Sequence, residues 1–360
     1  MSIMKTREEP YMAGINPEVQ AIIDRAFEGK AATQEECVKL LELDPHSPEA
    51  CALRGAADGL VRSRTGNAAV LFAQIGVSCH PCPANCSFCA FAKDYTQMGE
   101  FTMADDDIVA AVKSFTQDGD LFGLWIMAMA DYDIDEYCRV IRLVRETAPA
   151  CTNIYSNVGD SSYEDFCKMK EAGVAGVYHI CRLGEGEVTN LSPEVRRQTI
   201  QNAIDAGLDV LNAVEPIGPE HTPEQLAEQI MVMKAQNPIQ TGVMKRVNIP
   251  GTPFEGSGEI NHYRLAQIAA VQCLAHADME VLPWIGHHEP CEACYVSGTN
   301  LITAETGVNP RDTAEDTSTN RGMDLTDCRI MLYEAGFTKL AKGDGTLIDL
   351  DMDYIQAHIH

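Results

Sequence analysis

Residues 69–92 read AVLFAQIGVSCHPCPANCSFCAFA, an apolar run followed directly by a cysteine-rich loop. The run 69–78 has the length and composition of a buried strand. In a cytosolic chain, cysteines that cluster in this way more often bind metal or carry out redox chemistry than form disulfides. The segment therefore predicts a buried strand that leads into a metal-binding or redox loop, with four thiols within eleven positions: Cys79, Cys82, Cys86 and Cys89.

Seven further apolar runs follow, and helical segments with periodic apolar residues separate them. Strands that alternate with helices predict a parallel sheet, and eight such strands suffice to close a barrel. We therefore expect a full or nearly full (β/α)8 TIM-type barrel; an open doubly wound sheet is the alternative. In such a barrel the loops after the strands carry the chemistry, and the cysteine loop is one of them. The seven runs are 122–130, 151–157, 176–182, 209–218, 241–249, 279–286 and 300–305.

The first part of the chain differs from the rest, because it is predicted to be helical without strands. The segments NPEVQAIIDRAFEGK (16–30) and TQEECVKLLEL (33–43) have apolar residues at intervals of three and four. Thr33 is expected to be an N-cap, with Glu36 three positions later. We predict an N-terminal helical extension (1–66), the barrel (67–340) and a C-terminal tail (341–360).

The composition excludes some classes of function. With 27 basic and 53 acidic residues among 360, the formal net charge is −26. Nucleic-acid binding needs basic surfaces, so we do not expect it. There is no apolar run of about 18 residues and no apolar N-terminal region, which argues against a membrane span or a secretory signal. We expect a cytoplasmic protein.

The cysteine loop allows two metal sites. Zinc could use the pairs Cys79/Cys82 and Cys86/Cys89, but only three residues separate these pairs, which is short for two pairs that share one tetrahedral ion. Alternatively, Cys82, Cys86 and Cys89 form a Cys-x3-Cys-x2-Cys pattern. Three thiolates can hold three irons of a [4Fe–4S] cluster and leave the fourth iron open. In that case Cys79 is a spare cysteine or an alternative ligand.

The second pattern resembles that of the radical S-adenosylmethionine (SAM) superfamily. Nearly the whole chain resembles the branch of biotin synthase, methylornithine synthase and the [FeFe]-hydrogenase maturase HydE. The segments that carry the resemblance include VNIPGTPFEG (247–256) and RIMLYEAGF (329–337). The resemblance implies an enzyme that binds one [4Fe–4S] cluster and SAM, abstracts hydrogen from a small substrate and receives electrons from a donor such as ferredoxin or flavodoxin. It also implies cofactor or unusual amino-acid biosynthesis in an anaerobic host.

SAM-binding positions carry over from the same resemblance. The segment MAMADYD (127–133) occupies the place of a glycine-rich segment that binds the methionyl amine, and NVGDSSYEDF (157–166) resembles a ribose-binding motif. Both segments depart from the family pattern. The expected SAM contacts are Phe88 beside the adenine, the backbone of Ala128, Met129 and Ala130, the ribose-motif residues Asn157 and Asp160, Arg182 for the carboxylate, Glu185, and Ile217 beside the adenine.

A second group of potential ligands occurs in GHHEPCEACYVSG (286–298). His287, His288, Cys291 and Cys294 could hold an auxiliary iron–sulfur cluster or a zinc ion. Alternatively, the two cysteines are a redox pair, or they are incidental residues on one helical face. Because these residues follow the run 279–286, we expect them on the catalytic face of the barrel.

A candidate substrate pocket is predicted from Tyr155, Arg246, Asn248 and Trp284, which offer a cation, aromatic rings and hydrogen-bonding groups. These residues suit a small polar, carboxylate-bearing substrate, or else they simply fill the barrel interior. Biotin synthase holds a second cluster on cysteines that this chain lacks, so we do not expect it to make biotin. Two alternatives to hydrogen abstraction alone remain: a sulfur-insertion enzyme with an auxiliary cluster, and a non-catalytic iron–sulfur scaffold for metallocofactor assembly.

Overall fold

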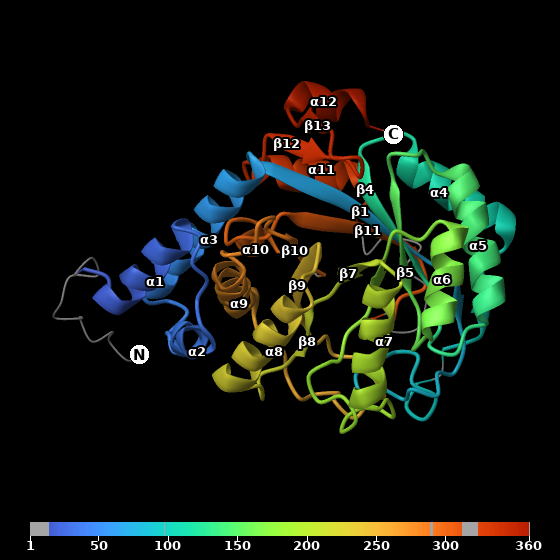
Figure 1. The fold of residues 1–360 in the computed structure, drawn as a ribbon, viewed down its shortest axis with the longest axis horizontal. Coiled ribbons are helices and arrows are strands. Elements are labelled where there is room, and N and C mark those ends of the chain that lie inside the picture. The colour runs from blue at the N-terminus through green and yellow to red at the C-terminus, as the bar shows by residue number, and fades with distance from the viewer. Residues whose placement is uncertain (1–13, 97, 289–290, 312–322, 360) are drawn as a thin grey trace, which may run out of the picture.

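The computed structural model describes residues 14–96, 98–288, 291–311 and 323–359. Its centre is a parallel barrel with eight strand positions and helices around it (Figure 1). Around the barrel the strands are β1 (Ala68–Gly76), β4 (Leu121–Met127), β5 (Asn153–Asn157), β6 (Gly176–Tyr178), β7 (Asp209–Leu211) with β8 (Val214–Ile217), β9 (Gln240–Lys245), β10 (Trp284–His287) and β11 (Leu301–Gly307). β11 pairs with β1 from Val70–Leu301 to Gly76–Gly307, which closes the barrel. The predicted (β/α)8 fold is confirmed, and this closing pair excludes the open sheet.

The side chains of β1 show how the sequence divides between the two faces of the barrel. Leu71 and Ala73 are buried among the surrounding helices, whereas Phe72 is buried with the aromatic residues of the interior. Successive strand residues point to opposite faces, so Gln74 points inward like Phe72. Both faces are covered, which explains why the run is apolar throughout.

Most of the helices between the strands begin at a polar N-cap residue. Ser162 and Thr222 each form a reciprocal capping box with the residue three positions later. A small antiparallel sheet precedes the first of these helices; its two strands are β2 (Ser78–Cys79) and β3 (Phe101–Thr102). The helices are α4 (Asp105–Thr116), α5 (Ile134–Thr147), α6 (Tyr163–Ala172), α7 (Pro193–Asp205), α8 (Pro223–Ala235), α9 (His262–Ala275), α10 (Glu292–Tyr295) and α11 (Leu325–Glu334).

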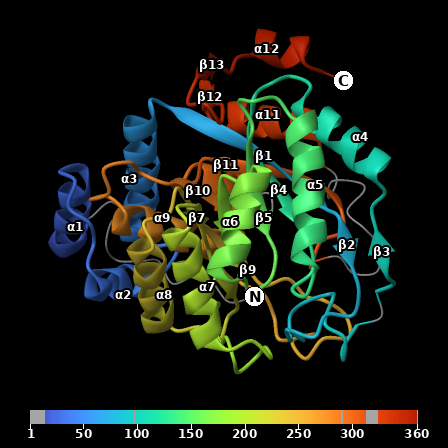
Figure 2. The same ribbon diagram turned by 45° about the vertical axis from the view of Figure 1, so that its right-hand side comes forward.

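The N-terminal extension consists of three helices: α1 (Pro17–Phe27), α2 (Gln34–Glu42) and α3 (Pro48–Thr65). The predicted capping box at Thr33 and Glu36 is confirmed at the start of α2. α2 packs against α8 and α3 packs against α9, so the extension covers one side of the barrel (Figures 1 and 2).

The C-terminal segment contains β12 (Lys339–Ala341), β13 (Leu347–Asp349) and α12 (Met352–Ala357). β12 extends the sheet beside the start of β1, and β13 pairs with β12 in the antiparallel direction. The boundary predicted between residues 340 and 341 falls inside β12, because a short hairpin continues there. These elements lie at the end of the barrel where β1 begins, opposite the loops that follow the strands (Figure 1). Within the described ranges, no helix combines the length and the apolar character that a membrane crossing needs.

Candidate functional site: a cysteine-lined cavity at the barrel mouth

The cysteine loop turns sharply between Cys82 and Cys86. Asn85 has a φ of 51°, a left-handed conformation that asparagine tolerates better than most residues. Its side chain donates to Asp94 Oδ2 over 2.9 Å and accepts from the Asp94 backbone N–H over 3.0 Å. The turn therefore depends on Asn85, and it brings the thiols on either side of it toward one cavity.

Backbone hydrogen bonds tie this loop to two others at the barrel mouth. The N–H of Ser87 donates to the carbonyl of Val188 over 2.9 Å, in the segment after β6. The N–H of Ala90 donates to the carbonyl of Pro310 over 2.8 Å, in the segment after β11. The cysteines are thus positioned by loops from three different strands, as expected for the catalytic face of a barrel.

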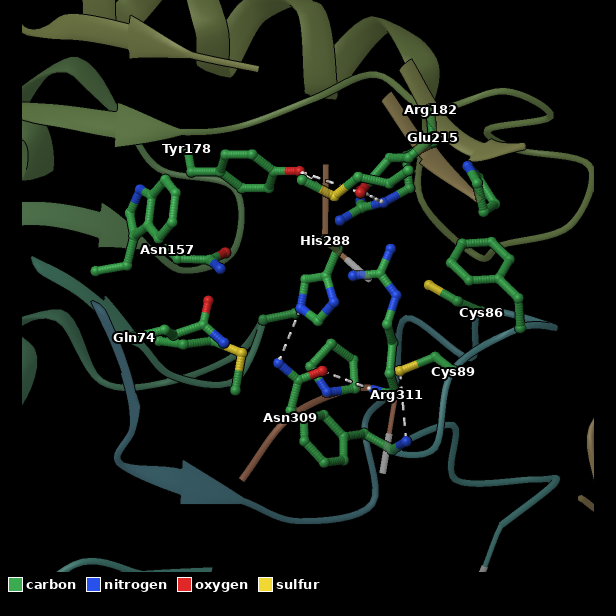
Figure 3. A pocket seen from close by; sticks show the side chains of 18 of the residues that line it. Gln74, Cys86, Cys89, Asn157, Tyr178, Arg182, Glu215, His288, Asn309 and Arg311 are labelled. Carbon is green, nitrogen blue, oxygen red and sulfur yellow. Dashed lines mark hydrogen bonds and ion pairs between the residues drawn. The ribbon is translucent and has the colours of Figure 1, made fainter. Parts of the chain in front are cut away.

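Cys82, Cys86 and Cys89 line a single cavity at this end of the barrel, and Phe88 lines it as well (Figure 3). Cys79 lies elsewhere: it belongs to β2, it is buried, and its thiol donates to the carbonyl of Gly99 over 3.3 Å. The structure therefore separates the three cysteines of the Cys-x3-Cys-x2-Cys pattern from the fourth.

Burial raises the pKa of all three thiols, and for Cys86 the pKa rises to about 11. Backbone N–H groups oppose this effect: that of Phe91 donates to Cys89 Sγ over 3.4 Å, and hydrogen bonds from Ala84 and Ala130 lower the pKa of Cys82. Bound iron would stabilise the thiolates further. These amides point at sulfur atoms that must become anionic ligands, so the residues fit an iron–sulfur cluster.

A single zinc ion fits less well. In the part of the chain that the structure describes, no three His, Cys, Asp or Glu side chains come close enough together to share one ion. A [4Fe–4S] cluster binds each thiolate to a different iron, so its ligands stand farther apart than those of one tetrahedral zinc. The geometry favours the three-cysteine alternative over the zinc alternative.

Arg182 lines the same cavity, where its charge acts to lower the pKa of Cys86, and it pairs with Glu215. Arg182 Nε donates to Glu215 Oε1 over 2.8 Å, and Tyr178 Oη donates to Glu215 Oε2 over 3.1 Å (Figure 3). Burial acts to lower the pKa of Arg182, but the carboxylates of Glu215 and Glu185 outweigh burial and raise it. Arg182 is therefore a fixed cation at the cavity, suited to a carboxylate.

The segment after β4 also reaches the cavity, as predicted. Ala128, Met129 and Ala130 line it together with Asn157 at the end of β5. A Cβ at Gly159 would lie 1.8 Å from the carbonyl oxygen of Ala130, so this close contact between the two loops requires glycine. The loop of Gly159 thus holds the backbone of Ala128–Ala130 in place, and this backbone is the part expected to bind the methionyl amine.

Asp160 and Glu185 were predicted SAM contacts, but neither is among the residues that line this cavity, and the structure pairs both with protein groups. His179 Nε2 and Arg196 Nη1 contact Asp160 Oδ1 at 3.0 and 3.2 Å. Glu185 accepts from Thr189 Oγ1 over 2.7 Å and from the Arg182 N–H over 3.0 Å. Both carboxylates therefore help to position the loop after β6.

Ile217 is fully buried in the apolar core between the barrel and its helices, although its neighbour Pro216 lines the cavity. Of the predicted substrate residues, Arg246 reaches the cavity, but it forms a two-pronged ion pair with Glu220 and stacks over the ring of Phe254 at 4.1 Å. Both terminal nitrogens of Arg246 thus already contact a carboxylate of the protein, whereas Arg182 is bound to Glu215 through Nε.

The other three predicted substrate residues lie outside the cavity. Tyr155 faces the barrel interior but packs against Phe72, with ring centroids 5.7 Å apart. Trp284 packs edge-on against Phe122 in the same interior cluster. Asn248 is exposed, and its side chain accepts from the N–H of Gly256. The interior rings fill a barrel layer below the cavity, which was the alternative interpretation.

The structure does not bring the four ligands of residues 287–294 together. His287 and His288 border the cavity, whereas Cys291 and Cys294 are buried in the apolar core that includes α9. The ring of His287 lies 4.5 Å from that of Tyr295 in α10. His288 pairs with Glu305 over 2.7 Å. The possible auxiliary site therefore lacks a common centre in the described residues.

Sequence reasoning missed several polar residues of the cavity wall. Glu215 lies within the predicted strand 209–218, and an acid beside a proline could have drawn attention to it. Nothing in the sequence pattern distinguishes the others, because which inward residues reach the mouth depends on strand register. The missed residues are Gln74, Trp125, Tyr178, Arg196, Glu215, Gln240, Lys245, Thr303, Glu305, Asn309 and Arg311.

Comparisons with known proteins find biotin synthases among the relatives of this chain. The chain is 26% identical over 277 residues to biotin synthase of Geobacter sulfurreducens, covering 73% of this chain and 81% of that protein. It is also 26% identical to biotin synthase of Acetivibrio thermocellus over 63% of this chain and 72% of that protein. No protein-family model matches the chain.

Solved structures show the same fold. Methylornithine synthase (PylB) superposes with a TM-score of 0.74 and 18% identity, covering 88% of this chain and 96% of that one. The [FeFe]-hydrogenase maturase HydG of Carboxydothermus hydrogenoformans superposes with a TM-score of 0.72 and 15% identity, covering 90% and 79%. Together with the three cysteines at the mouth of a closed barrel, the similarity to biotin synthases supports a radical SAM enzyme of the biotin synthase branch, and the solved structures show the same barrel fold.

Proposed function

We propose that this enzyme uses one [4Fe–4S] cluster and SAM to abstract hydrogen from a small polar substrate in the biosynthesis of a cofactor or an unusual amino acid. The observation that carries the proposal is the shared cavity. Three thiols, the Arg182 guanidinium and the backbone of Ala128–Ala130 all line it, and no other cysteine does so among the described residues.

Each group has a role that its geometry supports. Cys82, Cys86 and Cys89 would hold the cluster, and Phe88 would lie beside the adenine. Arg182, oriented by Glu215, would bind the SAM carboxylate, while the carbonyl edge of Ala128–Ala130 would accept from its amine. When bound, the cluster and SAM supply a 5′-deoxyadenosyl radical, and the cofactor rather than the protein carries that chemistry. The role of the protein would be to orient SAM.

The sulfur-insertion alternative receives less support. Biotin synthases are among the relatives, but Cys291 and Cys294 lie in the apolar core and not on the cavity. A non-catalytic scaffold remains a distinct alternative, because a scaffold would bind a cluster without cleaving SAM. We expect a catalytic, cytoplasmic protein that receives electrons from a carrier such as ferredoxin or flavodoxin.

The test is SAM cleavage by anaerobically reconstituted protein with a chemical reductant. We expect 5′-deoxyadenosine to form, and we expect Cys86→Ala to abolish its formation while Cys79→Ala preserves it. Cys79 is a matched control, because it lies in the same loop but outside the cavity. Cluster binding without 5′-deoxyadenosine formation would instead support the scaffold.

A further inference from the structure

One part of the cavity, here called the inner wall, is formed by Gln74, Trp125, Gln240 and Glu305. None of these residues is proposed to contact the cluster or SAM. Strand register places Glu305, Gln74 and Trp125 side by side on β11, β1 and β4, because Gln74 pairs with Glu305 on one side and with Trp125 on the other. All three line the cavity. They form one row of inward side chains at the same level of the barrel.

Gln240 in β9 and Gly286 in β10 also line the cavity. Gly242 and Gly286 are register partners there, and neither has a side chain to fill the interior. A Cβ at Gly286 would lie 3.0 Å from Leu301 Cδ2 and 3.6 Å from Gln240 Nε2. The absence of this one carbon leaves Gln240 at the wall of the cavity although it begins β9.

Two buried polar atoms on these walls have no hydrogen-bond partner among the described residues. They are Trp125 Nε1, a donor, and Gln240 Oε1, an acceptor. Trp125 is 6% exposed and Gln240 is 1% exposed, so bulk water does not satisfy them. Buried polar atoms are nearly always paired, and an unpaired one costs about 1–3 kcal/mol. Their position on a cavity wall indicates that a ligand completes these bonds.

The charge of this inner wall restricts the ligand. Glu305 is the carboxylate here; its Oε1 contacts His288 at 2.7 Å and accepts from Asn309 over 3.1 Å. Apart from Glu215, the other charged residues that line the cavity are cations. Arg182, Arg196, Lys245 and Arg246 are each paired with a carboxylate, that of Glu215, Asp160, Glu259 and Glu220 respectively. Arg311 lies beside Cys89 (Figure 3), and its charge also acts to lower the pKa of Tyr178. A carboxylate on the inner part of a substrate would face Glu305 and the Gln240 oxygen.

We propose that this inner wall is the substrate subsite and that it selects a nitrogen-bearing group, an amide or an amine, rather than a carboxylate. Gln240 Oε1 accepts from the N–H of that group, and Trp125 Nε1 donates to a substrate oxygen where one is present. Trp125 and Gln240 are therefore specificity-determining residues. This inference rests on the proposed function, since it names the substrate class of the same cavity.

The test uses three probes of one size: butyramide, butylamine and butyrate. Each is titrated into reconstituted protein with SAM and without reductant, and binding is followed by ligand-observed NMR. We expect butyramide and butylammonium to bind and butyrate to bind at least about tenfold more weakly, as the loss of one buried hydrogen bond predicts.

Three variants separate the roles of the two residues. Gln240→Leu should weaken both nitrogen-bearing probes about tenfold, whereas Trp125→Phe should weaken only butyramide, because butylammonium has no acceptor for the indole. Gln240→Glu, which keeps the size of the side chain, should shift the preference toward butylammonium. Trp284→Phe is the matched control, since Trp284 lies outside the cavity, and it should change nothing.

Equal binding of butyrate and butyramide, or unchanged selectivity in both Gln240 variants, would overturn the inference. Because these titrations need no turnover, their outcome is read independently of SAM cleavage. A wild-type protein that cleaves SAM but shows no selectivity contradicts the subsite alone. A protein that shows the selectivity but does not cleave SAM contradicts the proposed function alone.

Discussion

Arg182, which follows β6 and lines the cavity, donates from Nε to Glu215 Oε1 in β8 over 2.8 Å, and its Nη1 lies 3.8 Å from Glu185 Oε2, so two carboxylates orient the guanidinium. Lysine has a single ammonium group and cannot bind Glu215 and a ligand with the same planar geometry. We therefore expect Arg182→Lys to weaken SAM binding at least about tenfold, as measured by equilibrium dialysis with the oxidised, reconstituted protein.

Arg197→Lys is the control for this substitution, because Arg197 is exposed and pairs with Glu194 on the surface of α7. It should leave SAM affinity unchanged. If Arg182→Lys binds SAM as tightly as the wild type, Arg182 is not the carboxylate-binding residue.

At Gly159 the loops after β4 and β5 come into close contact, which is possible because glycine has no Cβ. Gly159→Ala would place a carbon 1.8 Å from the carbonyl oxygen of Ala130, so the backbone that is expected to bind the SAM amine must move. We expect SAM binding to fall by tenfold or more while the iron content remains close to that of the wild type. Gly55→Ala, at an exposed helical site with no atom within 4 Å, should bind SAM normally. Unchanged SAM affinity in Gly159→Ala would show that the Ala130 backbone plays no part.

Arg329 anchors α11 to the loop before β4 through a buried ion pair. Its Nε donates to Asp120 Oδ2 over 2.8 Å and its Nη2 donates to Asp118 over 2.6 Å, and the side chains of Arg329 and Asp120 are 1% and 0% exposed. Arg329→Met leaves these carboxylates buried without their cation, which typically costs about 3–5 kcal/mol. We expect the free energy of unfolding, measured by urea denaturation, to fall by about that amount.

The matched surface pair is Arg139 with Asp105, in which both side chains are about half exposed. Exposed pairs contribute about 0–1 kcal/mol, so Arg139→Met should have a much smaller effect. Equal effects of the two substitutions would mean that Arg329 does not act through its buried pair.

His179 makes stability depend on pH. Burial, followed by the neighbouring cation Arg196, lowers the pKa of His179 from 6.5 to about 3. The unfolded chain therefore binds a proton between pH 3 and 6.5 that the folded chain does not, so the free energy of unfolding falls as pH decreases below 6.5. His276, whose pKa burial lowers to about 4, acts in the same direction.

His179→Gln removes one of these two groups and keeps an N–H donor for Asp160. We expect the pH dependence between pH 6 and 4.5 to become shallower by up to about 1.4 kcal/mol per pH unit, the value for one proton. Urea denaturation at several pH values measures this slope. A variant with the wild-type slope would show that His179 is protonated in the folded protein.

The fold was predictable because its signals are local. Residues 69–78 are apolar on both faces, as a central barrel strand must be, and the capping residues Thr33 and Glu36 mark a helix start in the sequence itself. The hairpin β12–β13 was missed because its strands have three residues each, too few for a periodic pattern. The predicted strand 209–218 divides into β7 and β8 at Asn212 and Ala213.

The site was predictable only where neighbours in sequence are neighbours in space. The three cysteines, Phe88 and Ala128–Ala130 each lie within one loop. Tyr155 and Trp284 belong to the aromatic cluster of the barrel interior, but they do not line the cavity. Strand register brings Glu305 beside Gln74, residues that are 231 positions apart in the chain. Arg246 looked available in the sequence, because its partner Glu220 lies 26 positions away.

The most direct test of the central claim is the iron and sulfide content of anaerobically reconstituted protein, for the wild type and for Cys79→Ala, Cys82→Ala, Cys86→Ala and Cys89→Ala. The account predicts about four irons per chain in the wild type and in Cys79→Ala, and loss of the cluster in the other three variants. Iron that depends on Cys79 as strongly as on Cys86, or a wild-type protein that binds zinc and no iron, would contradict it.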